Sequence, residues 1–295
     1  LPKDYDQQLR KQGIKCTAFN PFIPILTSRF NNRDHRKIVV IDGTIAYTGG
    51  VNLADEYINR IQKYGYWKDN ALKLEGDGVW SFTIMFLTLW NYIHNADVDY
   101  TRYRIPQPVK QACDGFVQPY SDSPLDDEAT GETVYLNLIN RATQSVYITT
   151  PYLIVDNEMI TALCNAAKSG IDVRIITPGI ADKKIVNELT KAYYHILISC
   201  GVRIYEYTPG FIHAKTVLVD GEYATVGSVN FDYRSLYLHF ECGVWMYQTS
   251  CIQDIIADYG QMLKESHEIT IDDCNQVSIP RKMFRAILRI FAPMM

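Results

Sequence analysis

HRKIVVIDGTIAYTGGVN occupies residues 35–52, and HAKTVLVDGEYATVGSVN occupies residues 213–230. Each stretch predicts a β-hairpin, because an apolar strand is followed by an Asp-Gly turn, a second strand and a turn of small residues. A repeat of this kind indicates two related halves. At a constant offset of 178 residues, the matching positions are His35 and His213, Lys37 and Lys215, Asp42 and Asp220, Gly43 and Gly221, Gly49 and Gly227, and Asn52 and Asn230.

The segment before the second copy alternates strand and helix patterns, which predicts an α/β layer with a mixed, largely parallel sheet flanked by helices. Only 34 residues precede the first copy, so the first half is expected to lack its opening strand and helix units. The predicted strands are residues 144–154, 172–179 and 202–207, and the predicted helices are residues 157–170 and 183–201.

Residues 118–132 are polar and acidic and contain proline, which favours a linker between the halves. The chain then divides into a first half at 1–117, a second half at 133–280 and a C-terminal helix at 281–295. This last helix is basic and amphipathic, so it suits either a membrane interface or docking on the protein core. Its basic residues are Arg281, Arg285 and Arg289, and its apolar stripe contains Phe284, Ile287, Leu288 and Phe291.

Composition excludes several classes of protein. A chain of 295 residues with 47% hydrophobic and 21% charged residues is globular, not disordered. Its net charge of -4 gives no global positive field for a polyanion, so no nucleic-acid partner is expected. Seven cysteines without a CxxC pair predict neither a disulfide framework nor a zinc site. Residues 78–96 are uncharged, but a polar stripe predicts a helix packed on the core instead of one that spans a membrane.

The repeated histidines and lysines are the candidate catalytic groups. Residues i and i+2 of a strand project to one face, so His35 points with Lys37, and His213 points with Lys215. If the halves pack about a pseudo-two-fold axis, both pairs meet in one cleft that suits a phosphodiester. One neutral imidazole would attack phosphorus, and the other, protonated, would donate to the departing alkoxide. This chemistry requires no metal and no other cofactor.

A nucleophilic histidine needs a partner that fixes its tautomer and raises its basicity. Glu241 is the candidate partner of His213, because it follows in an alternating strand after the second turn. Asp69, at the start of a predicted strand, is the matching candidate for His35.

The remaining polar residues of the repeat divide into two kinds. Asn52 and Asn230 lie at equal offsets from the histidines, so we expect them to bind the substrate phosphate. Asp42 and Asp220 lie in Asp-Gly turns, and turn geometry alone explains them. We therefore leave both aspartates out of the catalytic set.

The doubled pattern HxK(x)4D(x)6G(G/S)xN resembles the signature of the phospholipase D superfamily, and YTGGVNLADEY, YWKD, TPGFIHAK and GSVNFDYRS closely resemble bacterial cardiolipin synthases. The resemblance covers nearly the whole chain. It implies a duplicated phospholipase D fold and transfer of a phosphatidyl group between two phosphatidylglycerol molecules, through a phosphohistidine and with release of glycerol. Of the two histidines, we favour His35 as the nucleophile. The resemblance also implies an anionic membrane surface as partner and a location at the cytoplasmic face of the cell membrane.

Two positions depart from the pattern of the superfamily. Gly50 stands where serine often follows the glycine, and His239 stands where asparagine often precedes the glutamate by two positions. Other functions fit the same core: a phospholipase D-type hydrolase, a phosphodiesterase acting on nucleic acid, or an inactive truncated module that binds anionic lipid.

Overall fold

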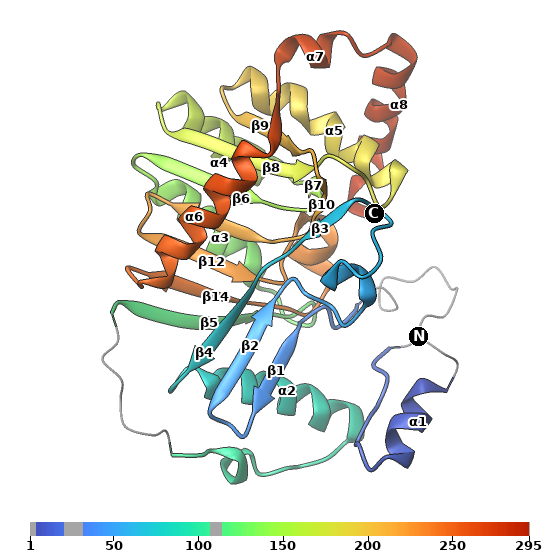
Figure 1. Ribbon diagram of the computed structural model, residues 1–295, viewed down its shortest axis with the longest axis vertical. Coiled ribbons are helices and arrows are strands. Elements are labelled where there is room, and N and C mark those ends of the chain that lie inside the picture. Colours follow the sequence, from blue (N-terminus) through green and yellow to red (C-terminus); the bar gives the residue numbers. More distant parts are fainter. Residues whose placement is uncertain (1–3, 21–31, 107–113, 295) are drawn as a thin grey trace.

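The computed structural model describes residues 4–20, 32–106 and 114–294 (Figure 1). The first half forms α1 (Tyr5–Lys11), β1 (Ile38–Ile41), β2 (Ile45–Gly49), η2 (Asp55–Ile58), β3 (Tyr66–Lys68), β4 (Ala71–Glu75), α2 (Val79–His94) and η3 (Tyr100–Tyr103), and β5 (Phe116–Asp122) follows. The second half forms α3 (Thr130–Arg141), β6 (Ser145–Thr149), β7 (Leu153–Ile154), α4 (Asn157–Lys168), β8 (Asp172–Pro178), α5 (Lys184–Ser199), β9 (Arg203–Tyr207), β10 (Gly210–Ile212), β11 (Thr216–Val219), β12 (Tyr223–Gly227), β13 (Phe231–Asp232), η4 (Arg234–Leu238), β14 (Glu241–Tyr247), α6 (Cys251–Lys264), β15 (Ser266–Ile269), α7 (Ile271–Asn275), α8 (Ile279–Ile290) and η5 (Ala292–Met294).

An eight-stranded sheet forms the centre of the molecule, in the order β15-β9-β8-β6-β11-β12-β14-β5. The predicted mixed sheet with flanking helices is confirmed. Within this sheet, however, parallel pairing is confined to β6-β8-β9, so the expected excess of parallel pairs is wrong. The reason is that the β11-β12 hairpin and its neighbours β14 and β5 all pair antiparallel, and these strands outnumber the crossover units.

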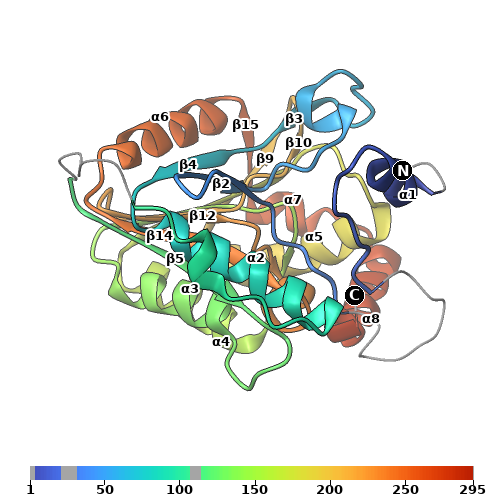
Figure 2. The same ribbon diagram turned by 90° about the horizontal axis from the view of Figure 1, so that it is seen from below.

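The first half adds a smaller antiparallel sheet in the order β1-β2-β4. Figure 2 shows α3 and α4 on one face of the large sheet, and the small sheet and α6 on the opposite face. The repeated hairpins meet in this interface, because Ala46 of β2 and its repeat partner Ala224 of β12 are fully buried in the same apolar cluster. That cluster also contains Val79 and Phe82 of α2, so the prediction that residues 78–96 pack on the core is confirmed.

Both copies of the repeat form the predicted hairpin with the same register. Ile38 pairs with Thr48 in the first copy, and Thr216 pairs with Val226 in the second. The turn aspartates Asp42 and Asp220 have φ of 50° and 54°, in the left-handed region that Asp-Gly hairpin turns use. Turn geometry therefore accounts for the two aspartates, as the sequence indicated.

The connection between the halves is shorter than predicted. Residues 118–122 of the expected linker belong to β5, and residues 130–132 belong to α3. Only residues 123–129 remain outside these elements, and the carboxylate of Asp122 accepts hydrogen bonds from the backbone N–H groups of Gly131 and Ser123.

Asp220 has a second structural role, which predicts a loss of stability in Asp220→Asn. Its carboxylate accepts hydrogen bonds from the backbone N–H groups of residues 143, 144 and 145, and these outweigh the effect of burial and lower its pKa. Since asparagine tolerates the same φ, the variant should lose about 1–2 kcal/mol of unfolding free energy through weaker hydrogen bonding alone. Urea denaturation measures this quantity.

Asp42→Asn is the matched control, because its φ is similar and its carboxylate makes no hydrogen bond to the described residues. Equal stability of the two variants would show that the hydrogen bonds of Asp220 contribute nothing.

Candidate active site

The two histidines lie just outside the hairpin strands, on extended segments that lead into them. His35 precedes β1, and His213 lies between β10 and β11. Each segment is fixed by the opposite half: the N–H of His35 donates to the carbonyl of Phe240 at 3.0 Å, and the N–H of His213 donates to the carbonyl of Lys68 at 2.7 Å. The pairing of β3 with β10 extends the second contact. Each catalytic segment is thus held by the chain that follows the other copy of the motif.

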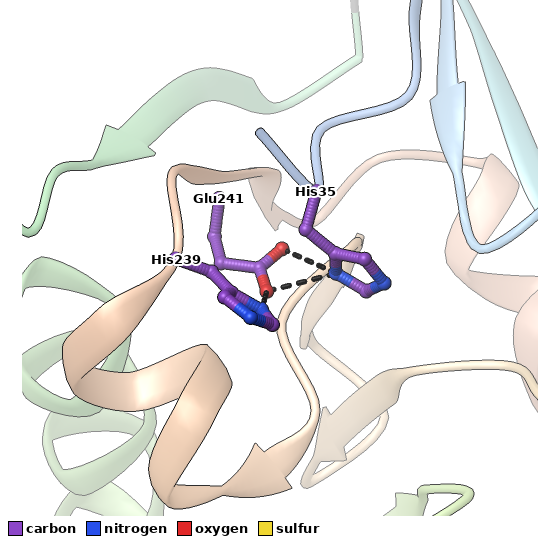
Figure 3. A group of neighbouring side chains, drawn as sticks. All are labelled: His35, His239 and Glu241. Carbon is purple, nitrogen blue, oxygen red and sulfur yellow. Dashed lines mark hydrogen bonds and ion pairs between the residues drawn. The ribbon is translucent and has the colours of Figure 1, made fainter. Parts of the chain in front are cut away.

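This exchange determines which carboxylate orients which histidine. Nδ1 of His35 lies 2.8 and 3.0 Å from the two carboxylate oxygens of Glu241 (Figure 3). Nδ1 of His213 lies 2.8 Å from Oδ2 of Asp69. The predicted partners are the right residues, but the predicted pairing is wrong. Asp69 follows Lys68 and Glu241 follows Phe240 in the chain, so each carboxylate reaches the histidine that its neighbour's carbonyl already holds.

Burial favours the neutral form of both imidazoles, while their partner carboxylates stay ionised. It lowers the pKa of His213 to about 3, with the Lys215 charge adding to the effect, and it also lowers the pKa of His35. Burial alone would raise the pKa of Glu241, but His35 and its other neighbours hold that pKa well below its usual range. The pKa of Asp69 is also lowered, because His213 and Lys215 outweigh burial. Since an ionised carboxylate only accepts hydrogen bonds, each histidine donates from Nδ1 and keeps its lone pair on Nε2.

The two lysines are cations without a carboxylate partner. Lys215 is 1% exposed, and Nζ lies 2.9 and 3.0 Å from the two ring nitrogens of His213. Nζ of Lys37 donates to the carbonyl oxygen of His35. Neither lysine forms an ion pair with any residue that the structure describes. Burial lowers the pKa of Lys215 to about 7 and also lowers that of Lys37, so an anion bound in this site would stabilise two ammonium groups that have no direct carboxylate contact.

The two asparagines differ in their surroundings. Nδ2 of Asn52 donates to the hydroxyl of Tyr57 at 2.6 Å. Asn230 is buried, and its Oδ1 has no hydrogen-bond partner among the described residues. A buried amide with unused hydrogen-bonding capacity suits a polar ligand, and phosphate binding by both asparagines stays a prediction.

The asymmetry between Gly50 and Ser228, which are matching positions of the repeat, now has a physical reason. A Cβ at Gly50 would collide with Oδ1 of Asp69, so only glycine lets that carboxylate reach His213. At the matching position, Oγ of Ser228 donates to Oε2 of Glu241 and accepts from the N–H of Cys242 at 3.0 Å. The two carboxylates therefore approach the turns differently, because a glutamate reaches one bond further than an aspartate.

Several aromatic residues around His213 escaped sequence reasoning. The ring of Tyr57 meets the imidazole edge-on at 5.2 Å between centroids, and Trp67 lies at the same distance. Phe211 completes the group at 6.0 Å. These residues flank the catalytic positions in the chain, but nothing in their spacing distinguishes them from ordinary core aromatics. They explain why His213 is more buried than His35.

His35, His239 and Glu241 form a group of potential metal ligands whose donor atoms lie within 4.8 Å of one another. Nδ1 of His239 lies 3.5 Å from Oε1 of Glu241 (Figure 3). The glutamate already accepts from His35 and Ser228, so the contacts read as a hydrogen-bonded network around one carboxylate. Catalysis without a metal stays a prediction.

Comparison with known proteins finds similarity to cardiolipin synthases. Residues 135–263 match the family described as "Cardiolipin synthase, PLD-like domain". The whole chain is 36% identical over 296 residues to a cardiolipin synthase of Geobacillus sp. (strain WCH70), covering 59% of that protein. It is 49% identical over 295 residues to an uncharacterized protein of Streptococcus mutans, covering 64% of it. The chain thus spans about three fifths of the length of these relatives.

The fold has a solved counterpart. The crystal structure of phosphatidylserine synthase from Haemophilus influenzae matches 90% of this chain and 70% of that chain, with a TM-score of 0.63 and 16% sequence identity. Within the described part of the chain, no helix is both long and apolar enough to cross a membrane.

Proposed function

We propose that this chain is a phosphatidyltransferase of the cardiolipin synthase type, within the phospholipase D superfamily. The observation that carries the proposal is the paired site: two histidines, each oriented by a carboxylate of the opposite half, beside two lysines without a carboxylate partner. Such a site combines a nucleophile, a proton carrier and positive charge for a phosphodiester. The lipid substrate is proposed from the names of the relatives.

In the proposed reaction, Nε2 of one histidine attacks the phosphorus of phosphatidylglycerol, and the bond from phosphorus to the glycerol oxygen breaks. The other histidine, which carries a second proton on Nε2 when the substrate binds, gives that proton to the departing glycerol alkoxide. In the second step it takes a proton from the terminal hydroxyl of another phosphatidylglycerol, whose oxygen displaces the histidine and forms cardiolipin. Lys37 and Lys215 stabilise the charge on the equatorial oxygens, with Asn52 and Asn230 as further donors.

The electrostatics favour His213 as the nucleophile, which reverses our expectation from sequence. A nucleophile must be neutral when the substrate arrives, and the general acid must carry a proton. His213 is the more buried imidazole and lies against the Lys215 ammonium, and its pKa of about 3 makes it the harder one to protonate. His35 has a side chain that is 24% exposed and a partner carboxylate with two oxygens in range, so it is the better proton carrier.

The proposal is tested by incubating the purified protein with phosphatidylglycerol in liposomes or mixed micelles, and by identifying the products by mass spectrometry. Cardiolipin and glycerol support a transferase. Phosphatidic acid would mean that water is the acceptor, which makes the protein a hydrolase. Absence of both products, with cleavage of DNA or RNA instead, would favour a nuclease.

The lowered pKa of Lys215 predicts how activity depends on pH. Above a pH of about 7 this lysine loses its charge in the free protein, so kcat/KM should fall as pH rises through that value. In Lys215→Arg the group stays charged, and the decline should move to higher pH even if the maximal rate is lower. Steady-state kinetics from pH 5 to 9 on a soluble phosphodiester, a range chosen to bracket the values of a histidine and this lysine, measure the profile.

Lys68→Arg is the matched control, because Lys68 lies near the site and already pairs with Asp258. Its profile should keep the wild-type decline. If the decline keeps its position in Lys215→Arg as well, another group is responsible for it.

A further inference from the structure

The C-terminal helix α8 packs with its basic side against the rest of the protein. Nε of Arg281 and Nε of Arg285 lie 3.0 and 2.9 Å from the same carboxylate oxygen of Glu188 on α5. The guanidinium of Arg289 lies 4.8 Å from the centre of the Tyr193 ring. Leu288 packs on the core from the same side of the helix. The alternative of docking on the core is thus confirmed for the basic side, and these contacts fix the orientation of the helix.

The opposite side of α8 and η5 is an exposed apolar stripe. A helix on a protein surface normally turns its apolar side inward, so this arrangement is reversed. A large exposed apolar patch on a protein surface marks a site that binds another protein, a ligand or a membrane. The stripe consists of Ile279 (74% exposed), Met283 (62%), Phe284 (45%), Ile287 (52%), Ile290 (75%), Phe291 (45%) and Met294 (65%).

The charge around the stripe is positive, although the chain as a whole carries -4. Residues 275–295 contain four basic residues and no acidic residue. Glu188 balances only one of the two arginines that contact it. An apolar stripe bordered by positive charge is complementary to an anionic lipid surface, into which such helices insert at the level of the headgroups.

A second apolar projection lies beside the catalytic site. Leu53, Ile58 and Ile61 are 99%, 65% and 52% exposed, on the segment between β2 and β3. Tyr57 of the same segment contacts the ring of His213. Figures 1 and 2 show this segment and α8 toward the right of the molecule, and Figure 2 places them at its upper and lower edges, with α5 between them. Because Tyr57 contacts His213, a lipid layer that reaches this segment would lie close to the catalytic site.

We propose that the apolar stripe of α8 and η5 is a membrane-interface surface, which inserts into an anionic bilayer together with the projection at Leu53, Ile58 and Ile61. The arginines hold the helix on the protein, and the apolar side chains enter the lipid. Choosing a bilayer over another apolar partner rests on the proposed function, since a lipid phosphodiester must be taken from a membrane.

The test is flotation of the full chain with vesicles, compared between phosphatidylglycerol–phosphatidylcholine mixtures and phosphatidylcholine alone. The wild type should float with the anionic vesicles. The double variant Ile287→Glu/Ile290→Glu should lose roughly tenfold or more of this binding, because it places two carboxylates in the inserted stripe. Leu125→Glu is the matched control, since Leu125 is 60% exposed on the connection between the halves, outside α8, and this variant should bind as the wild type does.

Two further measurements make the result decisive. Phe284→Trp should show a blue-shifted emission with anionic vesicles, which reports insertion of the stripe itself. The double variant should hydrolyse a soluble phosphodiester at the wild-type rate, because it leaves the catalytic residues unchanged. Undiminished binding by the double variant overturns the proposal, and so does conversion of a dimer to a monomer by the same substitutions, which would assign the stripe to a second copy. If vesicle binding depends on α8 but no cardiolipin forms, the proposed function is overturned, whereas the proposal that α8 binds membranes stands.

Discussion

The variant His213→Ala should lose roughly four orders of magnitude or more of kcat on every phosphodiester, whatever its leaving group. The proposed chemistry requires a covalent bond between phosphorus and Nε2 of this histidine, and alanine offers no substitute. Steady-state kinetics with phosphatidylglycerol and with a p-nitrophenyl phosphodiester measure the loss. Mass spectrometry of acid-sensitive peptides should find the phosphohistidine at His213 in the wild type.

The variant His35→Ala should separate the role of the proton carrier from that of the nucleophile. The proton that His35 supplies is needed for a glycerol alkoxide but not for p-nitrophenolate, which is a stable anion. The variant should therefore be inactive toward phosphatidylglycerol and still release a burst of p-nitrophenol, with phosphate left on His213 because deprotonation of the acceptor is also impaired. If the burst appears in His213→Ala and is absent in His35→Ala, the nucleophile is His35, as the sequence suggested. Circular dichroism and thermal unfolding of both variants confirm that the losses are not losses of fold.

The sequence was sufficient to predict the hairpins and the alternating strands and helices of the second half. Most of this rests on the motif that recurs at an offset of 178 residues, because a duplicated HxK at matching offsets has no ordinary structural reason. The same repeat predicted the turn role of Asp42 and Asp220, and the φ values of both residues agree.

What the sequence did not reveal is how the halves exchange contacts. Periodicity predicts which strands exist, but the pairing of β3 with β10, or of residue 34 with residue 240, joins segments far apart in the chain. The orienting carboxylates were assigned to the nearest motif in sequence, whereas each serves the other half. Similarly, amphipathicity identified the last helix, but only the ion pairs with Glu188 show which of its sides faces the protein.

The crossed pairing predicts large and unequal effects of the two carboxylates. Asp69→Asn and Glu241→Gln keep the size of the side chain and remove its charge, so each should misorient one histidine and lower kcat on phosphatidylglycerol by roughly 10²- to 10⁴-fold. Asp69→Asn should affect lipid and p-nitrophenyl substrates alike, since Asp69 holds the proposed nucleophile. Glu241→Gln should affect the lipid substrate far more, since Glu241 holds the proton carrier.

The His35→Ala background turns this difference into a test of the pairing itself. There, Glu241 has lost the imidazole that it orients, so adding Glu241→Gln should change the p-nitrophenol burst by less than a factor of about three, within the usual limits of additivity. Adding Asp69→Asn should lower the p-nitrophenol burst by the same factor as it does without the His35→Ala substitution. The reason is that the Nδ1 proton of His213 loses its acceptor in either background. Under the pairing expected from sequence the two outcomes would be exchanged, with Glu241→Gln impairing the burst and Asp69→Asn leaving it unchanged. The burst amplitudes of these two double variants therefore decide which half orients which histidine.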